Sequence, residues 1–237
     1  MPHFTLGNIE IEVAQKAIKN IHLSVYPPNG RVKIAAPSKM NLDTIRIYAI
    51  SKLPWIKKQQ AKIKSQKREA PREYITKESH YFLGKRYQLK VIELDTVPVV
   101  RLTHNYLELY VRPNSNKEKR QEVLENWYRE QLKALTAELI QKWEKKMKVN
   151  VNEFGIKKMK TKWGTCNDEA KRIWLNFELA KKPKECIEYI VVHEMVHLKE
   201  RTHNDRFVAF MNQFLPEWKQ LKTDLNKLPV SHIDWGY

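Results

Sequence analysis

Residues 185–206 read ECIEYIVVHEMVHLKERTHNDR, and this stretch determines much of what the rest of the sequence predicts. Apolar residues recur at helical spacing between positions 187 and 196, and Pro183 stands where a helix would start. His193 and His197 are four residues apart, so on a helix they are offset by about 40° and one turn. Two imidazoles placed in this way can bind one metal ion.

Glu194 completes an HExxH pattern with these two histidines. In metalloproteases with this pattern the glutamate takes a proton from the metal-bound water and does not bind the metal. A chance match is expected in on the order of one in fifty chains of this composition, and a lone helical histidine is often structural. The apolar helix around the pattern and a third histidine downstream favour the metal site, with Glu194 as catalytic base.

Catalytic zinc generally takes three protein ligands and leaves a fourth position for water. His203 is the expected third ligand. An unbroken helix would turn it away from His197, so the helix is expected to end between them. Thr202, with Asp205 three residues later, is typical of a capping box and would place His203 in the first turn of a second helix. Glu217 is the alternative ligand, because glutamate-liganded zinc enzymes place theirs on a later helix.

Upstream of the metal helix, two expected strands at 149–160 and 172–180 flank the loop 161–171. In this loop Trp163, Gly164 and Thr165 follow one another, a combination that favours a functional loop. A packed turn would explain the same residues nearly as well. The thiol of Cys166 is a second type of zinc ligand to consider, but this cysteine has no CxxC partner. A buried, inert thiol is the simpler interpretation. The residues expected to line the site are Trp163, Gly164, Thr165, Cys166, Asn176 and Arg206. Candidates for stabilising an oxyanion are Arg206, Tyr189 and His232.

The remaining sequence predicts an α+β protein. A β-hairpin is expected from 20–25 and 31–37 around PPNG, then helix from 41 to 67 with a kink or a new start at Pro54, and strands from 81 to 112. Between 116 and 148, apolar residues at three- and four-residue steps predict one long helix with a buried stripe. No internal repeat is evident. The expected division is an N-terminal β-rich region with a helical insert, 1–112, and an α-rich catalytic region, 113–237.

Composition limits the setting and the partners. The 237 residues include 44 Lys and Arg against 27 Asp and Glu, a formal net charge of +17. Such a charge favours anionic partners, but it is also typical of lysine-rich helices whose charged faces are simply solvated. We expect weak nucleic-acid binding without sequence preference. Neither a membrane-spanning apolar run nor a signal sequence is evident, and two cysteines make no disulfide framework, so a cytoplasmic location is expected. The oligomeric state is left open.

Three segments together resemble the YgjP-like family of metal-dependent hydrolases: WGTCN at 163–167, IWLNF at 173–177, and YIVVHEMVHLKERTHNDRF at 189–207. The resemblance implies a zincin-like metallopeptidase fold with a small sheet and an HExxH helix. It places His193, His197 and His203 as zinc ligands and Glu194 as the catalytic glutamate. Thr165 stands where the family pattern WGSC has serine, which retains the hydroxyl. The region is also similar to SprT-type proteases, whereas Glu200 stands where metzincins have a glycine.

The sequence therefore predicts a zinc-dependent hydrolase, first of all a metallopeptidase acting on peptides. A zincin-like fold would place residues 172–180 as an edge strand able to pair with an extended substrate. One alternative is a zinc-dependent hydrolase of nucleoside triphosphates that releases pyrophosphate, because a water activated by zinc can also attack a phosphoanhydride. Others are a DNA-associated SprT-like protease and a nucleic-acid-binding module with structural zinc.

Overall fold

The computed structural model describes residues 2–26, 29–65, 71–159 and 162–229. They form two compact units, Met1–Ala70 with Pro229–Tyr237, and Pro71–Leu228. The fold mixes helices and sheets, as the sequence predicts. The division between the units falls after Ala70, earlier than the expected boundary at residue 112. The strands between residues 79 and 111 belong to the second unit because they share one apolar core with the long helix that follows them.

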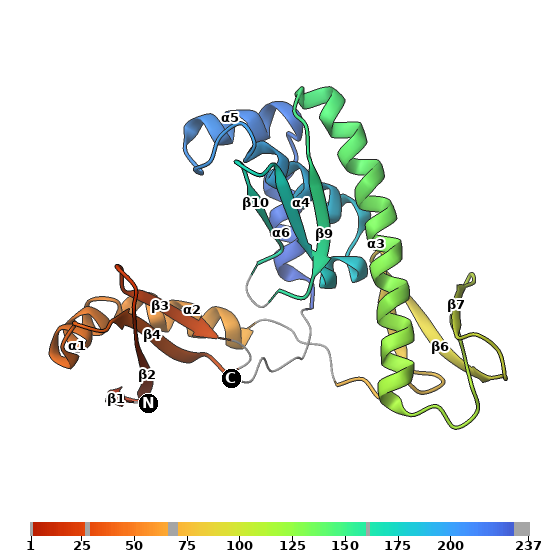
Figure 1. Cartoon of the computed structure of the whole chain (residues 1–237), viewed down its shortest axis with the longest axis horizontal. Coiled ribbons are helices and arrows are strands. Elements are labelled where there is room, and N and C mark those ends of the chain that lie inside the picture. Colours follow the sequence, from red (N-terminus) through yellow and green to blue (C-terminus); the bar gives the residue numbers. More distant parts are fainter. Residues whose placement is uncertain (1, 27–28, 66–70, 160–161, 230–237) are drawn as a thin grey trace. The chain divides into compact units, whose positions relative to one another are not determined.

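The first unit is a four-stranded sheet covered by two helices (Figure 1). Its hydrophobic core joins alternate residues of β2 and β4 to Ile45, Ala49 and Ile56 of the helices. The predicted hairpin is present as β3 and β4, and the predicted helical region is two helices that part at Lys52. The elements are β1 (His3–Leu6), β2 (Ile9–Lys16), β3 (His22–Tyr26), β4 (Arg31–Pro37), α1 (Leu42–Ser51) and α2 (Leu53–Ser65).

The second unit begins with another four-stranded sheet, followed by the predicted long helix α3 (Lys117–Met147). Asn116 caps this helix by accepting a hydrogen bond from the Lys119 backbone N–H at 2.9 Å. Its apolar stripe, from Leu124 to Met147, is buried against the sheet and the elements that follow the helix. The strands are β5 (Ser79–Phe82), β6 (Lys85–Glu93), β7 (Val99–Leu102) and β8 (Tyr106–Val111).

The two four-stranded sheets have the same topology. The strand orders are β1-β2-β4-β3 and β5-β6-β8-β7. In each sheet the first two strands pair antiparallel, the second and fourth pair parallel, and the third and fourth pair antiparallel. In each unit the next element is a helix capped by an asparagine, Asn41 or Asn116. The sequence analysis finds no repeat, because the shared feature is the order of pairing and not the identity of the side chains.

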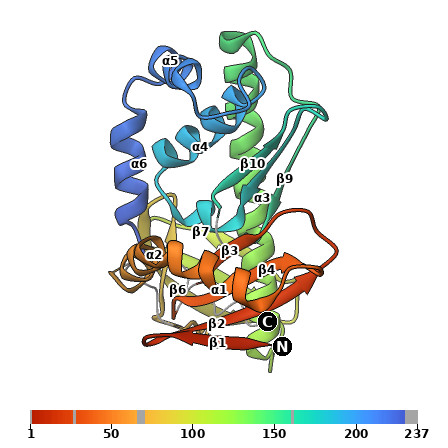
Figure 2. The same ribbon diagram turned by 90° about the vertical axis from the view of Figure 1, so that its left-hand side faces the viewer.

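Of the remaining elements of the second unit, α4, η1 and β9 contact α3 (Figures 1 and 2). A three-stranded sheet has the order β10-β11-β9, and a 3-10 helix leads from it into α4. The C-terminal helices α5 and α6 both contact α4. The elements are β9 (Glu153–Lys157), β10 (Gly164–Asn167), β11 (Arg172–Asn176), η1 (Phe177–Lys181), α4 (Lys184–Val196), α5 (Asp205–Phe214) and α6 (Trp218–Lys227).

Two local expectations in this region are wrong. The stretch 161–171, expected as a loop, contains strand β10, which pairs antiparallel with β11. Strand β11 therefore lies in the centre of the sheet, not at its edge, and ends at Asn176, where the chain turns into η1. The edge of the sheet that contacts α4 is β10.

Within the described residues, no helix is both long and apolar enough to cross a membrane.

Candidate active site

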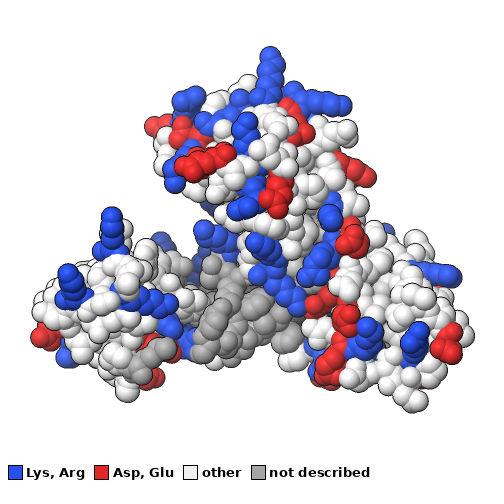
Figure 3. All heavy atoms as spheres, in the orientation of Figure 1, with Lys and Arg blue, Asp and Glu red and all other residues white. Residues whose placement is uncertain are grey.

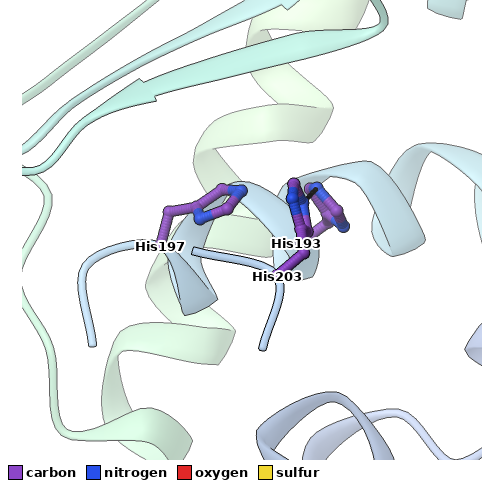
Figure 4. A group of neighbouring side chains, drawn as sticks. All are labelled: His193, His197 and His203. Atoms are coloured by element: carbon purple, nitrogen blue, oxygen red, sulfur yellow. Dashed lines mark hydrogen bonds between the residues drawn. The ribbon is translucent and has the colours of Figure 1, made fainter. Parts of the chain in front are cut away.

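Three histidines meet at the C-terminal end of α4 (Figure 4). His193 lies in the last turn of the helix, His197 is its C-cap, and His203 belongs to the segment between α4 and α5. One nitrogen atom from each ring lies within 4.8 Å of the other two. The Nε2 atoms of His193 and His203 are 3.0 Å apart. The described residues contain no other cluster of three or more His, Cys, Asp or Glu placed to hold a metal ion.

The helix ends between His197 and His203, as the spacing of the histidines requires, and this lets the chain turn back toward His193. Helix α4 ends at Val196, and the backbone N–H groups of Lys199 and Glu200 both bond to the Val196 carbonyl, which closes the turn. The next helix starts at Asp205, with Asn204 as its N-cap. The expected cap at Thr202 is therefore wrong: its hydroxyl bonds to the Glu200 carboxylate, and His203 precedes α5 instead of lying in its first turn.

Hydrogen bonding and burial keep the imidazoles suited to a cation. His197 Nδ1 lies 3.1 Å from the Glu200 carbonyl, so this nitrogen carries the proton and Nε2 keeps its lone pair. Burial, with the neighbouring His197 and His203, lowers the pKa of His193 to about 3. Burial also lowers the pKa of His197. His193 and His197 are thus uncharged at neutral pH, which is the form in which histidine binds metals.

The ring of His193 is held by packing. Its Nδ1 atom is buried and has no hydrogen-bond partner among the described residues. Tyr189, one turn earlier on α4, and Phe207 of α5 both contact this ring edge to face, with centroids 6.0 and 5.0 Å away. The same Phe207 ring lies 4.8 Å from His197 and 4.6 Å from His203. One buried phenyl ring therefore supports all three histidines.

Glu194 lies beside the histidines, with its side chain pressed against Gly164 of β10. The residue is only 5 % exposed, and burial raises the pKa of its carboxyl to about 8, partly opposed by Lys162. A Cβ atom at Gly164 would lie 2.6 Å from Glu194 Oε1 and 2.8 Å from its Cγ. Only glycine leaves room for the carboxylate at this point of the strand.

A cleft of about 730 Å³ opens over these residues. Its walls come from the start of β10, the turn between β10 and β11, the outward face of α4 and the segment that carries His203. The lining residues are Lys162, Trp163, Gly164, Thr165, Cys166, Asn167, Asp168, Glu169, Arg172, Trp174, Tyr189, Ile190, His193, Glu194, His197, Arg201 and His203.

A family model described as YgjP-like, metallopeptidase domain, matches residues 19–228. The chain belongs to the YgjP-like family. This membership makes it a metal-dependent peptidase in general terms and implies a bound metal ion. A search of curated proteins finds no match.

Two archaeal metallopeptidase zymogens are similar solved structures, jannalysin of Methanocaldococcus jannaschii and abylysin of Pyrococcus abyssi. Each is 21 % identical to this chain and covers 40 % of it. The matches span 92 % of jannalysin and 99 % of abylysin, with TM-scores of 0.33 and 0.36.

The segment WGTC lies in the cleft wall of this YgjP-like protein, whereas two other residues expected there do not. Asn176 is buried behind the wall, where its Nδ2 donates to the carbonyls of Met159 and Lys162 at 2.8 Å and its Oδ1 accepts from the Glu178 N–H. It holds the approach to β10 in place. Arg206 is not among the residues that line the cleft, and its Nε atom lies 4.0 Å from the Glu200 carboxylate.

The other residues considered as oxyanion donors or metal ligands differ in where they lie. Tyr189 lines the cleft, whereas His232 lies outside the described residues. Glu217 is the N-cap of α6 and is not part of the histidine cluster. The thiol of Cys166 lines the cleft but is not part of that cluster either, and burial raises its pKa to about 12.

Sequence reasoning missed several charged residues of the wall. Lys162, Asp168 and Arg201 all line the cleft and lie next to residues that were singled out. Nothing in their spacing distinguishes them from other surface charges. The close approach of Gly164 to Glu194 had a usable signal, because a glycine within a strand often marks a place where another group comes close.

Proposed function

We propose that the chain is a zinc-dependent peptidase in which His193, His197 and His203 hold the ion and Glu194 is the general base. The observation that carries the proposal is the convergence of three imidazole nitrogens within 4.8 Å at the floor of a cleft, with a buried carboxyl group on the same helix. Three protein ligands with room for a fourth are typical of catalytic zinc, whereas structural zinc is usually enclosed by four.

The donor set fits zinc. Zinc–nitrogen bonds of 2.0–2.1 Å in a tetrahedral site put ligand nitrogens about 3.4 Å apart. Here the Nε2 atoms of His193 and His203 are 3.0 Å apart, and all three ligand nitrogens lie within 4.8 Å of one another. Small side-chain movements would equalise these distances. Neutral imidazoles suit zinc, although other transition metals also accept them. The bound ion would supply a Lewis acid and lower the pKa of a coordinated water from 15.7 toward about 7.

Glu194 is placed to accept the proton of the attacking water. Burial raises the pKa of its carboxyl group to about 8, close to the value of about 7 expected for a zinc-bound water, so a proton can pass between the two with little cost. The positive charge of a bound ion would favour the ionised carboxylate that accepts this proton. Gly164 and the helix backbone fix where it points. A group that holds the proton in this way can also deliver it to the leaving amine as the peptide C–N bond breaks.

Tyr189 is the best-placed donor for the oxyanion that develops during attack. It lies one helical turn before His193, lines the cleft, and has no hydrogen-bond partner for its hydroxyl among the described residues. Burial, with the nearby Glu194, raises the pKa of its phenol to about 12, so it remains protonated. Arg206, the other described candidate, is not among the residues that line the cleft.

Strand β10 gives an extended substrate a place to bind. It pairs only with β11, so its other edge is without a strand partner within the described part of the chain. Trp163 and Thr165 bring this edge to the cleft wall. A peptide that pairs with β10 would gain backbone hydrogen bonds irrespective of its side chains, and its carbonyl groups would pass close to Glu194.

The decisive experiment compares the wild type with Glu194→Gln on labelled unstructured peptides, with ATP as a second substrate. We expect peptide cleavage, and a loss of about 10²-fold to 10⁴-fold in the variant because the general base is removed. Zinc content and thermal stability should be unchanged, since Glu194 is assigned no metal bond. Equal cleavage rates would refute the base role, and turnover of ATP alone would favour the phosphoanhydride hydrolase.

A further inference from the structure

The repeated topology of the two units allows the same helical positions to be compared in two copies. The first helix after each sheet begins at a capping asparagine, Asn41 for α1 and Asn116 for α3. Eight residues after the cap, both helices bury an apolar side chain completely, Ala49 in one copy and Leu124 in the other. The two helices therefore turn equivalent faces toward their sheets.

The helices differ in character at two positions that are exposed on α1. Six and nine residues after the cap, α3 has Glu122 and Glu125, which form ion pairs with Lys119 and Lys158. At the same positions α1 has Ile47 and Ile50. Since the module folds with glutamates there in one copy, its architecture does not require the isoleucines of the other.

Ile47 and Ile50 are exposed by 69 % and 51 %, and they are neighbours on the helix because they are three residues apart. Leu42 and Trp55 are also exposed on α1 and α2. We call Ile47 and Ile50 the apolar face of α1. Exposed apolar side chains that gather on one element are typical of a binding surface.

Basic side chains accompany this face. Residues 1–70 contain 13 Lys and Arg against 4 Asp and Glu, a formal net charge of +9. Figure 3 shows Lys and Arg at several points over this unit and few acidic groups. Arg46, Lys57 and Lys58 are exposed on α1 and α2 and form no ion pair within the described ranges. A ligand for this face must therefore offer apolar groups together with negative charge.

We propose that the apolar face of α1 is a docking site for a polypeptide segment in which apolar residues alternate with acidic ones, and that it recruits protein substrates to the first unit. The recruiting role rests on the proposed peptidase function. Isoleucines would bury against the apolar residues of the segment, while Arg46, Lys57 and Lys58 would attract its carboxylates. Holding a substrate at a second point raises its local concentration at the cleft.

Other occupants fit less well. A second copy of this chain would bring two basic units together, and like charges repel. A nucleic-acid backbone would be attracted by the lysines but gains nothing from Ile47 and Ile50, whose exposed methyl groups offer no contact to phosphate. An anionic lipid surface shares the required chemistry only in part, because binding in the bilayer interface scales with the apolar area buried, and this face presents only two neighbouring isoleucines.

The test uses the full chain with Glu194→Gln, so that a bound peptide is not consumed. The probe is a fluorescein-labelled peptide of alternating Leu and Glu, compared with a Leu–Lys peptide and a Ser–Glu peptide by fluorescence anisotropy. The double variant Ile47→Glu with Ile50→Glu reproduces the other copy of the module and should fold. Ile47→Ser with Ile50→Ser removes the apolar groups without adding charge, and Ala61→Glu adds one charge at another exposed position of the unit.

We expect the Leu–Glu peptide to bind, both control peptides to bind at least about tenfold more weakly, and both isoleucine double variants to lose about tenfold or more in affinity. Ala61→Glu should lose less than about threefold. Unchanged binding by the serine variant overturns the docking site. Isoleucine-dependent binding to phosphatidylserine vesicles, or isoleucine-dependent dimerisation in sedimentation, would overturn it in favour of a lipid surface or a second copy. Cleavage assays in the wild type report on the peptidase function separately, since the anisotropy experiment contains no catalysis.

Discussion

Gly164 and Glu194 lie so close together that only the absence of a side chain at Gly164 leaves room for the glutamate. A Cβ atom at position 164 would lie 2.6–3.0 Å from the Oε1, Cγ and Cδ atoms of Glu194. We expect Gly164→Ala to displace the carboxylate and to reduce peptide cleavage by about 10²-fold or more, while zinc binding by the histidines remains. Fold and metal content are checked by circular dichroism and metal analysis.

The double variant Gly164→Ala with Glu194→Ala is the control for this clash. Alanine at position 194 lacks the Cγ and carboxyl atoms that the new Cβ would meet, so the double variant should recover the thermal stability that Gly164→Ala loses, without recovering activity. If Gly164→Ala alone cleaves peptides at the wild-type rate, the close packing of these two residues does not determine where the base lies.

Metal analysis of purified protein tests the ligand set directly. We expect about one zinc per chain, lost in each of the variants His193→Ala, His197→Ala and His203→Ala, because three imidazole nitrogens are the minimum set at an open catalytic site. Glu217→Ala is the matched control and should retain its zinc, since Glu217 is not part of the cluster. Full retention in His203→Ala would show that the third ligand is another residue.

Replacement of Tyr189 by phenylalanine removes only the hydroxyl group. We expect a decrease in kcat of about 10-fold to 10³-fold, with KM and zinc content little changed, because the hydroxyl acts on charge that develops in the transition state. Arg206→Ala should be close to wild type, since that side chain lies outside the cleft. A rise in KM with unchanged kcat would indicate that Tyr189 binds the substrate and not the oxyanion.

His80 predicts a pH dependence of stability that is separate from the active site. It is 4 % exposed and contacts Glu78 at 2.8 Å, and burial lowers its pKa from 6.5 to about 4. The unfolded chain therefore binds a proton more readily than the folded one. The free energy of unfolding therefore has its full value above pH 6.5. It decreases as the pH falls from 6.5 toward 4, by up to about 1.4 kcal/mol per pH unit.

Urea unfolding at several pH values in this range, for the wild type and His80→Gln, measures the effect. Glutamine keeps a hydrogen-bond donor for Glu78 but does not titrate, so the free energy of unfolding should fall less steeply on acidification in the variant. Parallel curves for the two proteins would mean that His80 has a normal pKa in the folded state.

Local patterns predicted much of this fold. The apolar spacing between 116 and 148 predicted α3, and the four-residue spacing of His193 and His197 on an apolar helix predicted the core of the candidate site. These features depend on residues that are close in the sequence.

What sequence reasoning missed depends on partners far apart in the chain. The tetrapeptide GTCN is β10 only because β11 pairs with it. Arg206 turns toward Glu200, and Asn176 binds backbone carbonyls 14 and 17 residues away, neither of which its own neighbours in the sequence indicate. The division after Ala70 follows from which helix the strands up to Val111 pack against.

The end of helix α4 at Val196 divides the proposed ligands between two kinds of backbone. His193 is fixed by the helix and His197 by its cap, whereas His203 lies on a connection whose conformation must be ordered before the third bond can form. Ordering this connection costs conformational entropy, so the rate at which the protein releases its metal should depend on residues 198–204 more than on the helix. Length and composition of this short connection would then set how readily a chelator strips the enzyme, independently of how well the imidazoles match the ion.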